Sequence, residues 1–203
     1  MIDTVVLDLG NVLVRWDPAG PFVGRLPVPE AAAFLTEFDF MAFNHLQDAG
    51  RSWADARADL AAVAPEHLPA LDVYVEHFAD TLAGPVPGSD DLVRDLRTLG
   101  VRLLGLTNWS AETFHLAEPA APAIALLEDV LVSGEVGVAK PDPRVFALLT
   151  RRFGLRPECT VFVDDSATNV AAGAAAGFDA VLFTTAEELR ASLVARGLAL
   201  LRT

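Results

Sequence analysis

The chain begins with an apolar run that ends abruptly at a carboxylate. Asp8 follows the run Thr4-Val5-Val6-Leu7, and Gly10 and Asn11 come two and three residues later. A short apolar run bounded by turn residues is typical of a strand buried on both faces, as in parallel sheets. In open α/β sheets, functional groups gather at the carboxyl ends of such strands. Asp8 therefore lies where a reactive group is expected, although Asp before Gly is also a common turn residue.

From Ser89 onward, short apolar runs alternate with helical patterns. Strands are expected at 101–106, 130–132, 160–163 and 180–183, and helices at 89–99, 110–127, 145–153, 166–176 and after 183. Strands separated by helices predict βαβ units, a parallel sheet and right-handed crossovers. We therefore predict an α/β fold with a Rossmann-like parallel sheet flanked by helices.

The stretch between the first strand and this alternating part has helical periodicity without a strand pattern. Residues 30–83 carry these helical patterns, after a Pro- and Gly-rich stretch (14–29) that predicts turns and a linker. Gly84-Pro85-Val86-Pro87-Gly88 predicts a second hinge. We interpret the stretch as an inserted α-helical cap of about four helices. The predicted boundaries are 1–17 and 85–203 for the Rossmann-like core and 18–84 for the cap.

Composition excludes several classes of partner. The net charge of −13 argues against nucleic acid, whose binding requires a basic surface. No uncharged apolar run reaches the roughly 18 residues that span a bilayer, and the N-terminus lacks the basic start of a signal peptide. Cys159 is the only cysteine, so a reducing compartment is expected. We expect a cytoplasmic monomer or homodimer with no membrane or nucleic-acid partner.

Polar residues follow the predicted strands at positions that a parallel sheet would bring to one edge. They are Asp8, Thr107-Asn108, Lys140 and Asp164-Asp165. Three carboxylates at one place cannot all stay ionised without a cation. Carboxylate oxygens without nearby Cys or His favour a hard cation such as Mg²⁺. A metal, a lysine and a hydroxyl at one edge suit phosphoryl transfer.

Taken in order, these segments resemble the four motifs of the haloacid dehalogenase-like hydrolase superfamily, and together they span nearly the whole chain. The first motif matches at 8–13, the second at 106–108, the third at 140–143, and the fourth at 163–166 with Asn169 one helical turn on. The helical insertion lies where members of this family carry a type-one cap. The resemblance implies a hydrolase with a Mg²⁺ cofactor.

The resemblance assigns the metal ligands and the nucleophile. Asp8 would be the nucleophile that forms an aspartyl-phosphate, and the metal would bridge Asp8 and the phosphate. The Gly10 carbonyl and Asp165 would be further ligands, and Asp164 would act through water or by holding Lys140. Asp164 and Asp165 are equally compatible with capping a helix. Asn169 would bind a metal-bound water or face solvent.

The second and third motifs would hold the phosphate. Thr107 would donate its hydroxyl, with help from the backbone N–H groups of Thr107 and Asn108. Alternatively, Thr107 begins the next helix. Lys140 would neutralise the phosphate and Asp8, and it is the only lysine among the 15 basic residues.

One position departs from the pattern of the family. Its phosphatases usually carry a second Asp two residues after the nucleophile as general acid and base, and Gly10 stands there instead. Such a group is worth about 10²–10⁴-fold in rate, so a good leaving group such as that of a sugar 1-phosphate fits best. Asp17 is a candidate substitute or a turn residue before Pro18. Members with Asp-Leu-Gly-Asn at this point include proteins similar to α-D-glucose-1-phosphate phosphatase.

The cap would select the substrate. Trp16 and His45 are candidate substrate contacts, although such a histidine is more often a surface residue than a ligand. Trp53 could stack on a sugar, but its spacing with Ala56 and Leu60 predicts the interior of the cap.

We therefore expect a Mg²⁺-dependent phosphatase acting on a small phosphorylated metabolite. The alternatives are a 2-haloacid dehalogenase, which needs no metal, and a weakened protein that binds a phosphorylated metabolite without turnover.

Overall fold

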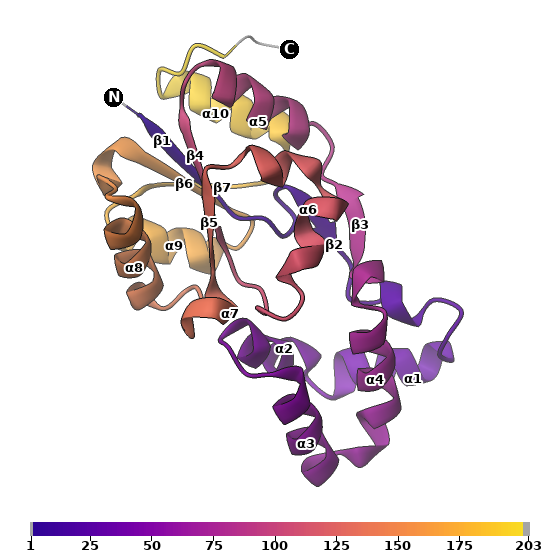
Figure 1. Cartoon of the computed structure of the whole chain (residues 1–203). Helices are drawn as coiled ribbons and strands as arrows, with labels where there is room; N and C mark the ends of the chain where they lie inside the picture. The colour runs from indigo at the N-terminus through magenta and orange to yellow at the C-terminus, as the bar shows by residue number, and fades with distance from the viewer. Residues whose placement is uncertain (1, 201–203) are drawn as a thin grey trace.

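The computed structural model describes residues 2–200, and within that range the chain forms a five-stranded, wholly parallel sheet with a separate group of helices at one end (Figure 1). The order of the strands is β5-β4-β1-β6-β7. The strands are β1 (Thr4–Leu7), β4 (Arg102–Thr107), β5 (Asp129–Val132), β6 (Thr160–Asp164) and β7 (Asp179–Leu182). This arrangement confirms the predicted Rossmann-like α/β fold.

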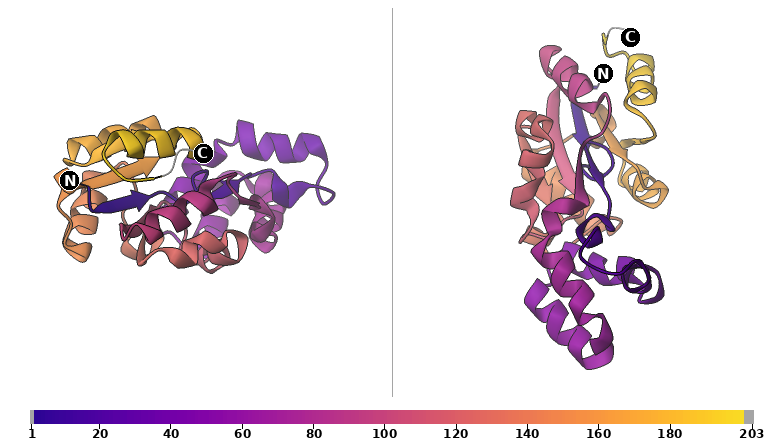
Figure 2. Two further views of the ribbon diagram at one scale, coloured as in Figure 1. Left: turned by 90° about the horizontal axis from the view of Figure 1, so that it is seen from above. Right: turned by 90° about the vertical axis from the view of Figure 1, so that its right-hand side faces the viewer.

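Helices connect the strands and cover both faces of the sheet (Figures 1 and 2). The long ones are α5 (Ser89–Thr98), α8 (Pro143–Phe153), α9 (Ala167–Ala175) and α10 (Ala186–Ala195). The short ones are η5 (Phe114–Leu116), α6 (Ala117–Ala120), η6 (Pro122–Leu126), α7 (Ser133–Val136) and η7 (Pro157–Cys159). No helix in the described part of the chain has both the length and the apolar character that crossing a bilayer requires.

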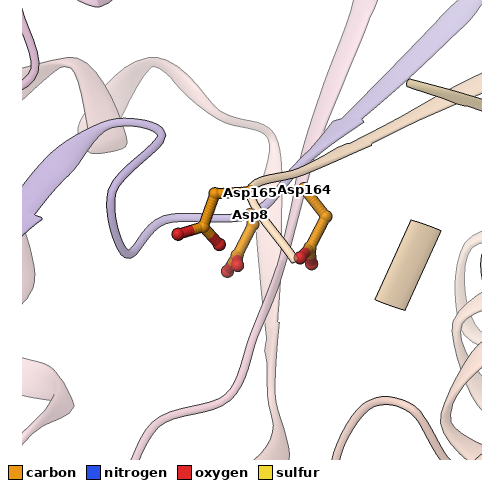
Figure 3. A group of neighbouring side chains, drawn as sticks. All are labelled: Asp8, Asp164 and Asp165. Carbon is orange, nitrogen blue, oxygen red and sulfur yellow. The ribbon is translucent and has the colours of Figure 1, made fainter. Parts of the chain in front are cut away.

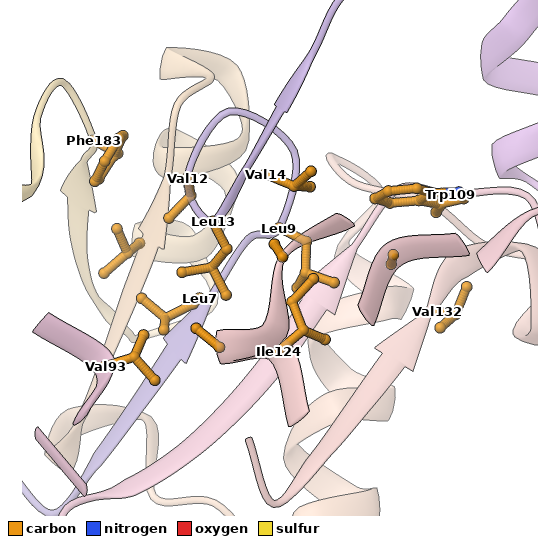
Figure 4. Packing of buried hydrophobic residues seen from close by; sticks show 14 of the residues in the cluster. Leu7, Leu9, Val12, Leu13, Val14, Val93, Trp109, Ile124, Val132 and Phe183 are labelled. Carbon is orange, nitrogen blue, oxygen red and sulfur yellow. The ribbon is translucent and has the colours of Figure 1, made fainter. Parts of the chain in front are cut away.

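The central strand is apolar at every position because both of its faces are buried. Successive side chains of a strand point to opposite faces. Val5 and Leu7 belong to a cluster with α5 and α10 (Figure 4), whereas Val6 belongs to a second cluster with α8 and α9. Every side chain of β1 is fully buried or nearly so. The strand is thereby fixed on both sides, and so is the backbone that leads into Asp8.

A group of helices between β1 and α5 lies beyond the carboxyl end of the sheet, at the lower end of Figure 1 and of the right-hand view of Figure 2. Aromatic contacts hold it together, among them Phe40 against Tyr74 at 4.8 Å and Trp53 against Tyr74 at 5.8 Å between ring centroids. Its elements are η1 (Gly20–Phe22), α1 (Val28–Ala32), η2 (Ala33–Glu37), α2 (Phe40–Asp48), α3 (Trp53–Val63), η3 (Pro65–His67), α4 (Leu68–Glu76) and η4 (Phe78–Thr81). We keep the name cap for residues 18–84, whose boundaries remain a prediction.

The two segments that join the cap to the sheet differ from the prediction. The sequence predicted turns and a linker at 14–29 and a hinge at 84–88, but β2 (Val14–Trp16) and β3 (Leu82–Pro85) pair as an antiparallel ribbon. The Arg15 guanidinium also donates to the Ala83 carbonyl. Pro and Gly in β3 hid this strand, because both residues are typical of breaks between elements.

Candidate active site

The buried side chain of Lys140 lies at the centre of the site. Its Nζ lies 2.9 Å from Oδ1 of Asp8 and 2.7 Å from Oδ2 of Asp164, and it donates to the Leu106 carbonyl at 2.9 Å. Each N–H of the ammonium thus has an acceptor among the described residues. Burial lowers the pKa of Lys140, but the carboxylates of Asp8 and Asp164 raise it above its ordinary value. Lys140 therefore stays charged near neutral pH.

Asp164, the last residue of β6, uses both carboxylate oxygens to fix its neighbours. Oδ2 accepts from Lys140, whereas Oδ1 accepts from the backbone N–H of Ser166 and from Nδ2 of Asn169, each at 2.9 Å. The side chain is fully buried. Of the alternatives left open by the sequence, the structure shows Asp164 holding Lys140. The N-cap residue of α9 is Ser166, and no side chain caps that helix.

Asp8 follows β1 directly and presents one oxygen to the protein. Its Oδ1 accepts from the Leu9 N–H at 2.7 Å and contacts Lys140, whereas no donor among residues 2–200 contacts Oδ2. Burial raises the pKa of Asp8 to about 7, the Lys140 charge opposes this increase, and the Asp164 charge adds to it. An oriented carboxylate with an unengaged oxygen is suited to nucleophilic attack.

Asp8, Asp164 and Asp165 form an acidic cluster whose chemistry fits a hard cation. Each offers a carboxylate oxygen, and these oxygens lie within 4.8 Å of one another. Figure 3 shows the Asp8 carboxylate between those of Asp165 and Asp164. Burial raises the pKa of Asp165, and a hydrogen bond with the side chain of Asn11 opposes this increase. Carboxylates without Cys or His in the cluster are ligands that Mg²⁺ prefers.

The second predicted motif lies next to Lys140, but its two residues are placed differently. Thr107 ends β4 and is buried. Asn108 binds the Lys140 backbone from both sides: its Nδ2 donates to the Lys140 carbonyl at 2.8 Å, and its Oδ1 accepts from the Lys140 N–H at 2.8 Å. This pair of hydrogen bonds fixes the loop that carries Lys140.

A cavity of about 330 Å³ opens between the acidic cluster and the cap. It is within the range of small-ligand sites. Seven of the predicted site residues line it, namely Asp8, Gly10, Trp16, His45, Asn108, Asp165 and Asn169. Trp53 also lines the cavity, as a residue that stacks on substrate would. Its side chain is buried, as the predicted place in the interior of the cap requires. Thr107, Lys140 and Asp164 are buried and are not among the lining residues.

Asp17 is not among the residues that line this cavity. Its carboxylate accepts from the Ala19 N–H at 2.9 Å, and its own N–H donates to the Thr81 carbonyl. The side chain is exposed. This is the turn geometry that the sequence offered as the alternative, and it gives no support to proton transfer by Asp17.

Sequence reasoning missed two residues of the site. Asn11, with a left-handed backbone (φ 54°), accepts from the Trp16 N–H through Oδ1 and lines the cavity. An Asn after Gly is a signal for such a turn. Asp48, the last residue of α2, lines the cavity from the cap side, and burial raises its pKa to about 7 against the Lys140 charge. Its position depends on how α2 packs, for which the sequence has no local signal.

Residues 2–177 match the sequence model of a protein family described as haloacid dehalogenase-like hydrolase. The phosphoglycolate phosphatase of Caulobacter vibrioides is 31% identical over 190 residues, which cover 88% of the chain and 78% of that enzyme. Drimenol cyclase drtB of Aspergillus calidoustus is 29% identical over 204 residues, which are 95% of the chain but only 36% of that protein. The chain thus spans about a third of the cyclase.

The fold also matches solved structures. A HAD family enzyme from Bacteroides thetaiotaomicron, crystallised with magnesium and inorganic phosphate, matches with a TM-score of 0.69 and 21% identity. The match covers 91% of the chain and 96% of that structure. At this identity the likeness shows that the two proteins share a fold.

Proposed function

The chain belongs to the haloacid dehalogenase-like hydrolases, and from this premise we propose that it is a Mg²⁺-dependent phosphatase of small phosphorylated metabolites. The observation that carries the proposal is the placement of Asp8 on the floor of the cavity, with Lys140 on one of its oxygens and Asp164 and Asp165 beside it. The phosphatase relative supports the same reaction.

In this proposal the acidic cluster holds Mg²⁺ through Asp8, Asp165 and the Gly10 carbonyl, with Asn169 nearby. The metal, when bound, neutralises negative charge on the phosphate and on the carboxylates. Asp164 is less available as a direct ligand, because both of its oxygens already accept hydrogen bonds. Its part is to orient Lys140.

The residues of the chain divide the remaining work. Oδ2 of Asp8 attacks phosphorus, and the aspartyl-phosphate is then hydrolysed by water. Lys140 stabilises the charge that develops on the phosphate, as a preformed cation that needs no reorganisation. Thr107 and the backbone N–H groups beside it are the proposed further donors. Asn108 keeps the Lys140 loop in place for this role.

We propose a hydroxylated substrate such as a sugar phosphate, with an α-D-glucose-1-phosphate-like ester as the first choice. The volume of the cavity, about 330 Å³, suits a small metabolite. Trp16, Trp53 and Trp109 provide apolar walls, and Asn44 and His45 provide polar groups on the cap side. The cap would open to admit substrate and close to exclude water. A cytoplasmic location is part of this proposal, and Cys159 as the only cysteine supports it.

Phosphate release from a panel of sugar phosphates and p-nitrophenyl phosphate tests the proposal. Release that requires Mg²⁺, stops with EDTA and is absent from Asp8→Asn is the expected result, and the best ester identifies the substrate class. No release from any ester with Mg²⁺ present would contradict it. Halide release from 2-haloacids without metal would instead identify a dehalogenase.

A further inference from the structure

The proposed reaction needs a proton donor that the usual position lacks. When the phosphorus–oxygen bond of an alkyl ester breaks, the ester oxygen leaves with the electron pair and must take up a proton. Gly10 has no side chain with which to supply it. Among the described residues that line the cavity, the side chains with an ionisable group are Asp8, Asp165, His45 and Asp48. Asp8 is the nucleophile and Asp165 belongs to the acidic cluster, so His45 and Asp48 remain.

Asp48 is the better placed of these two. It ends α2 and lines the cavity from the cap, whereas Asp8 follows β1 of the sheet. An ester oxygen in line with attack by Asp8 lies on the far side of phosphorus from Asp8. Nδ2 of Asn44 contacts its Oδ2 at 3.3 Å, and no donor among residues 2–200 contacts Oδ1. Burial raises the pKa of Asp48 to about 7, against the Lys140 charge. The His45 side chain, by contrast, is exposed to water.

The cavity wall that contains Asp48 also contains a buried donor without a protein partner. Nε1 of Trp53, a lining residue, has no hydrogen-bond partner among the described residues. The Tyr74 hydroxyl lies close enough to Asp48 for the Asp48 charge to raise the pKa of Tyr74 further, beyond the effect of burial. Buried donors are normally satisfied. An unsatisfied indole N–H in the wall of the same cavity as Asp48 indicates that a polar ligand group binds there.

We propose that Asp48 is the general acid and base of the reaction, in place of the side chain that Gly10 lacks; this inference rests on the proposed phosphatase function. In the first step, Oδ2 of Asp8 bonds to phosphorus, the ester bond breaks, and the Asp48 carboxyl gives its proton to the leaving oxygen, which departs as an alcohol. In the second step, the Asp48 carboxylate takes a proton from water as the water oxygen bonds to phosphorus. The Asp8–phosphorus bond breaks, inorganic phosphate leaves, and Asp48 is protonated again.

The test compares two esters that differ in how much they need this proton. Glycerol phosphate has an alkoxide leaving group, whereas p-nitrophenolate leaves without protonation. Asp48→Asn is expected to lower kcat/KM for glycerol phosphate by about 10²-fold and that for p-nitrophenyl phosphate by less than about threefold. Asp59→Asn is the matched control, because it makes the same change at an exposed cap carboxylate and should alter neither rate.

A second variant places an acid at the position where the family usually carries one. A Cβ at Gly10 would meet nothing within 4 Å, and its backbone is not in the left-handed region, so Asp fits there. Gly10→Asp combined with Asp48→Asn is expected to recover hydrolysis of glycerol phosphate. Equal loss on both esters without recovery, or no loss on either, would overturn the role of Asp48 and leave the phosphatase intact. A wild-type protein inactive on every ester would overturn the proposed function and this inference with it.

Discussion

The ammonium of Lys140 contacts Oδ1 of Asp8 at 2.9 Å. The contact leaves Oδ2 of Asp8 directed to the cavity without a protein donor among the described residues. It also makes Lys140 the cation that both buried carboxylates of the site share, since Asp164 lies 2.7 Å from the same nitrogen. The orientation of the proposed nucleophile and the burial of the Asp8 and Asp164 carboxylates side by side both depend on this lysine.

Removing the charge of Lys140 is expected to destabilise the fold. Lys140→Met leaves Asp164 buried without its cation, and breaking such a pair costs roughly 3–5 kcal/mol. Arg144→Met removes a cation from an exposed pair and should cost less than about 1 kcal/mol. Urea unfolding at neutral pH measures both changes. Equal stability of the two variants would mean that Asp164 does not depend on Lys140.

Asn108 is expected to affect activity by holding Lys140. Asn108→Ala removes two hydrogen bonds to the Lys140 backbone and should lower the free energy of unfolding by roughly 1–3 kcal/mol. It should also lower kcat, because the ammonium is no longer fixed. Asn108→Asp keeps the acceptor for the Lys140 N–H and loses the donor. Full activity of Asn108→Ala, measured as phosphate release, would exclude this positioning role.

The arrangement of the sheet and of the acidic cluster could be predicted from the sequence because the signals were local. The apolar runs of β1, β4 and β6 end in polar residues of the site, and Lys140 follows β5 after the short helix α7. A parallel sheet places these ends at one edge, so Asp8, Lys140 and Asp164 follow from topology. Their shared hydrogen bonds could then be expected without knowledge of any side-chain conformation.

What the sequence did not predict depends on contacts between distant segments. The β2–β3 ribbon forms from two segments on either side of the cap, and β3 contains Gly84 and Pro85. The contact of Asn108 with the Lys140 backbone joins two loops. Asp48 reaches the cavity only because aromatic packing sets the angle of α2, with Phe40 against Tyr74. None of these pairings has a period or motif in the chain.

Magnesium binding should be visible without turnover. If the acidic cluster holds the ion, Mg²⁺ binds the folded state and raises Tm with concentration. Asp165→Asn should need at least about tenfold more Mg²⁺ for the same increase in Tm, because it lacks one carboxylate ligand. Asp59→Asn changes an exposed carboxylate of the cap outside the cluster and should leave the shift unchanged. The measurement is Tm over a series of Mg²⁺ concentrations, with a sample in EDTA as the metal-free reference. The same Mg²⁺ dependence of Tm in Asp165→Asn and in the wild type would refute the site.

Asp48 is expected to link stability to pH. Its pKa is about 7 in the folded protein and near the ordinary value of 3.8 in the unfolded chain. Between these values the folded protein holds a proton that the unfolded chain releases, so this stabilisation is complete below about pH 4 and is lost as the pH rises to about 7. Asp48→Asn removes the titration. Relative to the wild type, the free energy of unfolding of Asp48→Asn should rise by on the order of 4 kcal/mol from about pH 4 to pH 8. Urea unfolding in EDTA at a series of pH values measures the free energies of unfolding of both proteins. A difference between them that does not change with pH would contradict the prediction.

The most direct test of the central claim is to trap the proposed intermediate on Asp8. Acid quenching during steady turnover of a sugar phosphate with Mg²⁺, followed by digestion and mass spectrometry, should find phosphate on the peptide that contains Asp8. The account predicts this adduct in the wild type and its absence in Asp8→Asn, along with a loss of phosphate release of at least roughly 10⁴-fold. Phosphate release by Asp8→Asn at the wild-type rate, or an adduct at another residue, would contradict the assignment of Asp8 as the nucleophile.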